Sequence, residues 1–244
     1  MANNERVTIT LPDGASMGAY VASPDTPGPH ASVIIWMEIF GVNTHIQSVV
    51  DRVAAEGYVA IAPDFFHRSG PGLELGYDED GFTEGVKHMT ALEADNMVAD
   101  AKASVEYLRG RSDTTEKVGV MGFCIGGHMT YLTAAETDVA AADSFYGGGI
   151  SAPQGPGGAP STVSRPSKIS SKIICLYGEK DEHIPLDQVE EVKQALSSAG
   201  IDHEVHVYPD ADHGFFCDMR ESYHPSSASD AWDRVKAVFN ENLR

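Results

Sequence analysis

Cys124 stands between two glycines in the sequence Gly122-Phe123-Cys124-Ile125-Gly126. This spacing is that of a nucleophile elbow, G-x-S-x-G, with sulfur in place of the serine oxygen. In an elbow the nucleophile lies on a strained turn between a strand and a helix, and the glycines keep side chains from colliding with it. The N-terminus of the following helix would stabilise a thiolate there. The pattern therefore predicts a nucleophilic Cys124; a buried core cysteine beside tight glycines is the alternative.

A carboxylate and an imidazole follow Cys124 in the chain order nucleophile, acid, histidine. Asp181 comes after the apolar run 173–177, and His213 comes after the run 204–208. In such a triad His213 would remove the thiol proton and later activate water, while Asp181 would fix the histidine tautomer. Taken singly, Asp181 could cap a helix that starts near residue 185, and His213 could be a polar loop residue. Together, the three residues favour a Cys–His–Asp triad.

Motifs for other kinds of chemistry are weaker. The chain has no G-x-x-x-x-G-K-[ST] sequence and no G-x-G-x-x-G that opens a helix, so nucleotide binding has no motif to support it. His203 and His206 lie in a predicted strand, where their odd separation sends the two rings to opposite faces. Asp210 and Asp212 beside His213 are interpreted as a solvated turn. We therefore expect neither a cofactor nor a metal ion.

The elements that must position these residues alternate along the chain. Strands are predicted at 31–37, 58–62, 118–121, 140–146, 173–177 and 204–208, and helices at 44–56, 87–109, 126–135, 186–199 and 226–242. Such alternation predicts an α/β fold with a mostly parallel central sheet and helices on both faces. Two weakly alternating runs, 6–11 and 17–22, flank a turn signal and predict an N-terminal antiparallel hairpin.

In two segments the apolar residues have no regular spacing. Residues 66–85 contain five glycines and one proline and are predicted to be irregular, and residues 147–168 contain six glycines and four prolines and are predicted to form a loop or flexible flap. The chain has no repeat, and its 244 residues suit one α/β domain spanning 1–244. In open parallel sheets, functional residues gather at the carboxyl ends of the strands, where Cys124, Asp181 and His213 are expected.

Composition limits the class of partner. The chain has 17 basic and 36 acidic residues and a formal charge of −19, which disfavours binding to nucleic acid or to anionic lipid. Apolar runs such as 31–37 are far shorter than the ~18 residues of a membrane helix. The start of the sequence lacks a secretory pattern, and three cysteines suit a reducing compartment. We expect a cytoplasmic protein, a monomer or a homodimer, that acts on a small molecule.

The residues at the predicted strand ends resemble the dienelactone hydrolase (carboxymethylenebutenolidase) family of the α/β-hydrolase superfamily. The similarity covers nearly the whole chain and is carried by Glu38-Ile39-Phe40-Gly41-Val42-Asn43, Ala62-Pro63-Asp64, residues 118–127, Gly178-x-x-Asp181-x-x-Ile184-Pro185 and His213-Gly214-Phe215. It implies the α/β-hydrolase fold and a Cys124–His213–Asp181 triad. It also implies an oxyanion hole made by the backbone N–H groups of Ile39 and Ile125.

The resemblance further implies that Glu38 accepts the thiol proton when substrate arrives, although the residue alone could be an ordinary loop carboxylate. The expected reaction is hydrolysis of a small lactone or ester through an acyl-thioester on the cysteine, without a cofactor. Two alternatives stay open. One is a promiscuous ester or thioester hydrolase outside aromatic degradation, and the other is a non-catalytic relative that binds a ligand or uses Cys124 and Cys217 as a thiol switch.

The sequence departs from the family pattern in the substrate site. Members that cleave dienelactone resemble one another in holding the substrate carboxylate with two arginines, and the corresponding positions here are Thr83 and Cys217. Arg220, Lys87 and Arg68 are the candidates to replace them, while Cys217 either lines the pocket or packs in the core. We therefore expect uncharged esters or lactones to be turned over at least as efficiently as dienelactone.

Overall fold

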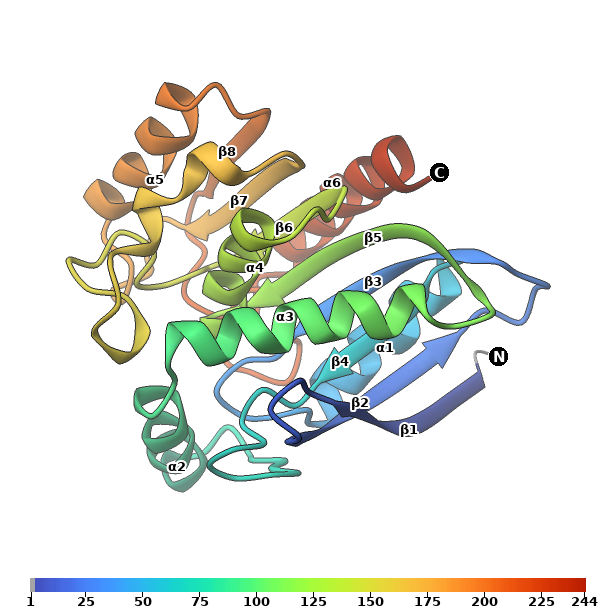
Figure 1. Cartoon of the computed structure of the whole chain (residues 1–244). Coiled ribbons are helices and arrows are strands. Elements are labelled where there is room, and N and C mark those ends of the chain that lie inside the picture. The colour runs from blue at the N-terminus through green and yellow to red at the C-terminus, as the bar shows by residue number, and fades with distance from the viewer. Residues whose placement is uncertain (1–2) are drawn as a thin grey trace.

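One twisted sheet of eight strands organises the part of the chain that the computed structural model describes, residues 3–244 apart from the side chain of Ser167 (Figure 1). Its strand order is β1-β2-β4-β3-β5-β6-β7-β8. The strands are β1 (Asn3–Thr10), β2 (Ser16–Ser23), β3 (His30–Trp36), β4 (Val59–Pro63), β5 (Thr114–Phe123), β6 (Ala141–Phe145), β7 (Lys172–Gly178) and β8 (His203–Tyr208). β1 and β2 pair antiparallel, as do β2 and β4. All pairs from β4 to β8 are parallel, which confirms the predicted sheet and hairpin.

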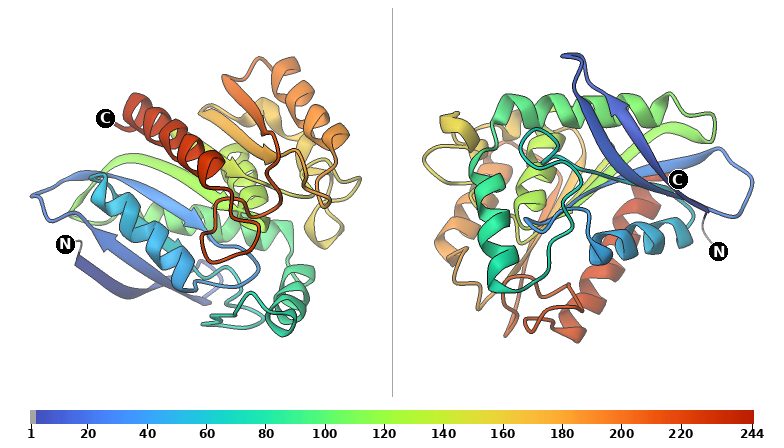
Figure 2. Two further views of the ribbon diagram at one scale, coloured as in Figure 1. Left: turned by 180° about the vertical axis from the view of Figure 1, so that it is seen from behind. Right: turned by 90° about the horizontal axis from the view of Figure 1, so that it is seen from below.

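Helices cover both faces of the sheet. They are α1 (Thr44–Ala55), α2 (Glu79–Thr90), α3 (Ala94–Arg109), α4 (Ile125–Glu136), α5 (Leu186–Ser198) and α6 (Pro225–Leu243). The right-hand view of Figure 2 shows α3 on one face and α1 and α6 on the other. α4 packs beside α3 and is buried from Ile125 to Ala135, so the helix that follows Cys124 lies in the interior.

The predicted helix over 87–109 is wrong, because the structure has two helices there, α2 and α3, separated by residues 91–93. α2 also takes up part of the segment predicted to be irregular. The Asp78 carboxylate caps this helix by accepting from the Gly81 N–H at 2.8 Å. A Cβ atom on Gly85 would lie 2.4 Å from the Ile39 carbonyl oxygen. The glycines that suggested a loop thus allow α2 to pack tightly against the backbone after β3.

Residues 147–168 contain three short 3-10 helices, at Pro156–Gly158, Thr162–Ser164 and Pro166–Lys168. His128 of α4 joins both ends of this segment, since its Nδ1 lies 3.0 Å from the Gly148 carbonyl and its Nε2 lies 2.8 Å from Thr162 Oγ1. The loop predicted here is therefore held against the central helix. None of the helices within residues 3–244 is long and apolar enough to cross a membrane.

Candidate active site

Cys124 lies at the turn between β5 and α4, as the elbow pattern predicts. Its backbone has φ 57° and ψ −120°, in the left-handed region that side chains rarely adopt. The strained turn is held from both sides: the Cys124 N–H donates to Phe145 O at 3.1 Å, and the N–H of Gly127 donates to Cys124 O at 2.9 Å. The side chain is partly exposed and faces a cavity.

The two elbow glycines are required by backbone contacts rather than by contact with the nucleophile. A Cβ atom on Gly122 would lie 2.2 Å from the Gly126 carbonyl oxygen. A Cβ atom on Gly126 would lie 2.3 Å from the carbonyl oxygen of Trp36, in β3. Side chains at these two positions would therefore collide with the backbones of α4 and β3, rather than with Cys124 as the pattern predicts. The glycines let the helix N-terminus approach the ends of β3 and β5.

Asp181 and His213 meet at the adjacent strand ends. His213 Nδ1 lies 2.7 Å from Asp181 Oδ2, and both residues are buried. The other carboxylate oxygen, Oδ1, accepts from the backbone N–H groups of His183 at 2.9 Å and of Ile184 at 3.2 Å. The acid is thus fixed by its own loop and can orient the imidazole.

The charge state of His213 follows from these neighbours. Burial alone would lower the pKa of His213, but Cys124 and the hydrogen bond with Asp181 outweigh it and raise the pKa to about 10. A histidine with a raised pKa holds a proton readily beside a sulfur atom. The geometry is therefore suited to proton transfer from Cys124 to His213.

Glu38 follows β3 and is 1% exposed. Its carboxylate pairs with Arg220, whose Nη1 lies 3.1 Å from Oε1, and it lies 3.5 Å from the Tyr77 hydroxyl. The guanidinium also stacks over the rings of Phe40 and Tyr77, with centroids 5.7 and 5.8 Å away. Burial, followed by the nearby Glu38 charge, raises the pKa of Tyr77, so this hydroxyl stays protonated and can donate.

One cavity of about 480 Å³ brings most of the predicted site together. Its lining includes the predicted residues Ile39, Cys124, Ile125, His213 and Arg220. Asp181 does not line the cavity; it contacts His213, and Glu38 likewise reaches it through Arg220. The predicted nucleophile, histidine and oxyanion-hole residues therefore share one space.

The remaining predicted substrate-binding residues do not line this cavity. Lys87 is exposed and its Nζ lies 2.5 Å from Glu84 Oε2. Arg68 Nη1 lies 2.7 Å from the buried carboxylate of Asp100. Cys217 is fully buried, and Thr83 is exposed on α2. Of the three candidate cations, the structure brings Arg220 alone to the cavity.

The apolar wall of the cavity was not among the predicted residues. It is formed by Phe82, Val86 and Met89 of α2, with Leu92 after it. Phe82, Val86 and Met89 have the spacing of one helical face, and this signal could have been found in the segment that was predicted to be irregular because of its glycines. Residues 154–157 of the following loop add to the same wall.

The strand order of the sheet, its antiparallel hairpin and the strand–turn–helix elbow at Cys124 are those of an α/β-hydrolase. A family model described as "Dienelactone hydrolase family" matches residues 17–243. The chain therefore belongs to the dienelactone hydrolase family.

Individual relatives agree with this assignment. A Synechocystis sp. protein provisionally named carboxymethylenebutenolidase is 40% identical over 242 residues, which cover 97% of this chain and 96% of that protein. A carboxymethylenebutenolidase of Pseudomonas putida is 28% identical over 231 residues, 94% of this chain and 93% of that one. The crystal structure of a provisionally named dienelactone hydrolase from Klebsiella pneumoniae has a TM-score of 0.89 and 34% identity, with 99% of each chain covered. The protein is a carboxylic ester hydrolase.

The buried ion pair between Glu38 and Arg220 yields a stability prediction. Arg220→Ala would leave the Glu38 charge without its partner, and we expect the free energy of unfolding in urea to fall by about 2–4 kcal/mol. This is slightly below the usual cost for such a loss because the Arg220 side chain is 21% exposed. Arg220→Ala combined with Glu38→Gln should recover at least half of the loss.

A double variant no more stable than Arg220→Ala would contradict the pairing of Glu38 with Arg220. Arg6→Ala, which breaks an exposed pair with Glu74, is the matched control and should change little.

Proposed function

We propose that this carboxylic ester hydrolase uses Cys124 as its nucleophile and cleaves small lactones or esters. The observation that carries the proposal is the position of the Cys124 side chain on a positive-φ elbow, in the same cavity as a histidine bound to a buried aspartate. A core cysteine would have no reason to occupy a strained turn that opens to a cavity. The other two cysteines, Cys175 and Cys217, are buried and do not line this cavity.

In the first half of the reaction, His213 accepts the thiol proton and the sulfur of Cys124 bonds to the substrate carbonyl carbon. The carbonyl oxygen takes the negative charge and accepts hydrogen bonds from the N–H groups of Ile39 and Ile125. Ile125 is the first residue of α4, where backbone N–H groups have no partner within the helix. The carbon–oxygen bond of the ester then breaks, and His213 gives its proton to the leaving alkoxide.

In the second half, the acyl-thioester on Cys124 is hydrolysed. His213 removes a proton from water, whose oxygen attacks the acyl carbon. The carbon–sulfur bond breaks, the acid leaves, and the proton returns to the sulfur. Asp181 stabilises the imidazolium in both halves through its 2.7 Å contact with Nδ1.

We assign to Glu38 the role of first acceptor of this one thiol proton when substrate is bound; it passes the proton to His213, which then gives it to the leaving alkoxide. The carboxylate is buried and held by Arg220, which lines the cavity beside Cys124. A neutral ligand whose oxygen accepts a hydrogen bond from Arg220 would loosen this pair without replacing it and would let Glu38 turn to the sulfur. The thiol would thus be activated chiefly in the presence of substrate.

The cavity favours an uncharged substrate. Its α2 wall is apolar, and its cation, Arg220, already neutralises Glu38. A substrate carboxylate that recruited Arg220 would leave Glu38 buried without its partner, and that cost would offset the new contact. We infer that the acyl group is short and neutral and packs against Val86 and Met89.

Three further assignments belong to the same proposal. We place the protein in the cytoplasm, with support from its three free cysteines. We treat residues 1–244 as one domain, with support from the single sheet and a hydrophobic core that spans it. A monomer and a homodimer both fit the site, whose residues all come from one chain.

The role of Cys124 is tested by substitution. Cys124→Ala should lower the rate of hydrolysis of a chromogenic short-chain ester by at least about a thousandfold, because the attacking atom is lost. Cys175→Ala is the matched control; it should keep the rate and cost about 1 kcal/mol of unfolding free energy through lost core contacts. If the Cys124→Ala protein kept a tenth of the wild-type rate, the assignment would be wrong. Ligand-induced stabilisation without turnover in the wild-type protein would instead support a non-catalytic relative.

The preference for neutral substrates is tested with matched esters. We expect kcat/KM for the methyl ester of dienelactone to equal or exceed that for the dienelactone anion, because the Arg220 charge is already paired. A preference of a hundredfold or more for the anion would contradict this, since it equals about 2.7 kcal/mol of differential transition-state binding.

A further inference from the structure

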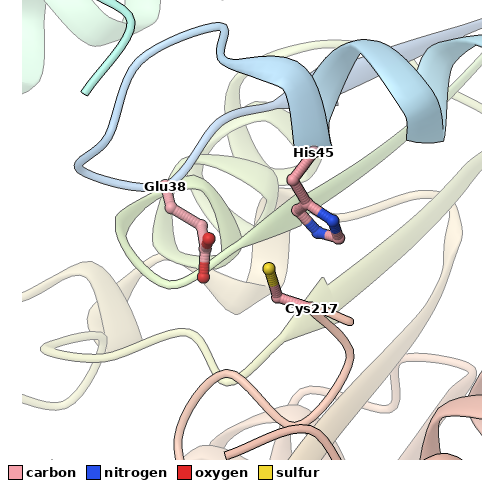
Figure 3. A group of neighbouring side chains, drawn as sticks. All are labelled: Glu38, His45 and Cys217. Atoms are coloured by element: carbon pink, nitrogen blue, oxygen red, sulfur yellow. The ribbon is translucent and has the colours of Figure 1, made fainter. Parts of the chain in front are cut away.

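Three buried side chains converge behind the cavity, beside the site described above. Glu38 follows β3, His45 lies in the first turn of α1, and Cys217 lies in the loop between β8 and α6. One carboxylate oxygen, one ring nitrogen and the sulfur all lie within 4.8 Å of one another. Figure 3 shows the three side chains pointing toward a common space from three separate segments.

His45 has no partner that explains its burial. The residue is 2% exposed, and neither of its ring nitrogens makes a hydrogen bond. The exposed Asp218 carboxylate lies 3.7 Å from Nδ1, within ion-pair range of a charged ring but beyond hydrogen-bonding distance. The ring packs against Phe123 and Phe216, contacts that a phenylalanine would make without burying two nitrogens. A buried polar nitrogen left unpaired costs stability, so its retention points to a ligand.

The donor set has a defined chemistry. Both ring nitrogens of His45 are buried and without a hydrogen-bond partner, so the ring can offer a lone pair to an ion. The carboxylate and a thiolate carry two negative charges, one of which Arg220 offsets, so a divalent ion would compete with Arg220 for Glu38. Imidazole nitrogen, thiolate sulfur and carboxylate oxygen are the ligands that zinc and cobalt take in tetrahedral sites.

We propose that Glu38, His45 and Cys217 form a binding site for a thiophilic divalent metal ion of the zinc class. The fourth position would be taken by water. Donors around a tetrahedral zinc ion lie roughly 3.5 Å apart, so the side chains would draw together by about 1 Å. The thiol would release its proton on binding, as metal-bound cysteines do.

An ion at this site would engage the same carboxylate that pairs with Arg220. Glu38 would then be withdrawn from the sulfur of Cys124, so that the ion inhibits hydrolysis. This consequence rests on the proposed function, in which Glu38 accepts the thiol proton, whereas ion binding itself does not. The site would thus let a metal ion inhibit hydrolysis through Glu38, without a bond between the ion and Cys124.

Binding is tested with Co²⁺ on a Cys124→Ala background, which removes the one partly exposed thiol of residues 3–244. Co²⁺ should produce the near-ultraviolet absorption of a cobalt–thiolate bond, saturating at one ion per chain, and Zn²⁺ should abolish it by displacement. Adding Cys217→Ala or His45→Phe should remove the absorption. Adding Cys175→Ala, which removes a buried cysteine outside the cluster, should leave it unchanged. His45→Gln repeats the test with a polar side chain, in case the phenylalanine variant does not fold.

No cobalt–thiolate absorption, or absorption that survives the loss of Cys217 or His45, would overturn the proposal. Inhibition is a separate measurement on proteins that keep Cys124. There, Cys217→Ala should raise the Zn²⁺ concentration for half-inhibition of ester hydrolysis at least tenfold. Cobalt binding at the cluster with unchanged zinc inhibition would confirm the metal site and contradict the role proposed for Glu38.

Discussion

The close approach of α4 to the ends of β3 and β5 is the constraint on which the site depends. Gly126 lies so near the Trp36 carbonyl that no side chain fits between them. This contact brings the helix N-terminus to the strand ends and forces Cys124 to a φ of 57°. Ile39, which follows β3, and Ile125, which follows Cys124, both line the cavity. The strain at Cys124 is offset by the burial of α4 along nearly its whole length.

Around this turn the charges are arranged in buried pairs. Asp181 binds His213, and Glu38 binds Arg220. Each carboxylate is almost fully buried, whereas each cationic partner reaches the cavity. Ligand binding can therefore act on His213 and Arg220 directly and on the two acids only through them. That arrangement couples the state of the carboxylates to the contents of the cavity.

The sequence could predict the features that depend on residues close together in the chain. The glycine spacing around Cys124, the strand before it and the helix after it lie within about twenty consecutive residues, so the pattern specifies the turn. The order of Asp181 and His213 could be interpreted because parallel strands end at one edge of a sheet. α2 was missed because Gly81 and Gly85, which permit close packing in the structure, look like loop signals when packing partners are unknown.

Contacts between segments that are distant in the sequence could not be predicted from it. Nothing near Arg220 indicates that its partner is Glu38, which lies on another segment, and the three candidate cations could not be ranked without the fold. The convergence of His45 and Cys217 on Glu38 is of the same kind. Such contacts depend on how loops at the strand ends fold over one another, and this has no periodic signal.

The covalent acyl-thioester proposed on Cys124 can be trapped by mixing the enzyme with a short-chain ester and quenching with acid within the first turnover. The modified peptide is then mapped by mass spectrometry. We expect an acyl adduct on the peptide that contains Cys124, formed together with the first equivalent of alcohol and lost as acid is released. An adduct on any other residue, or a first equivalent of alcohol released with Cys124 unmodified, would contradict it.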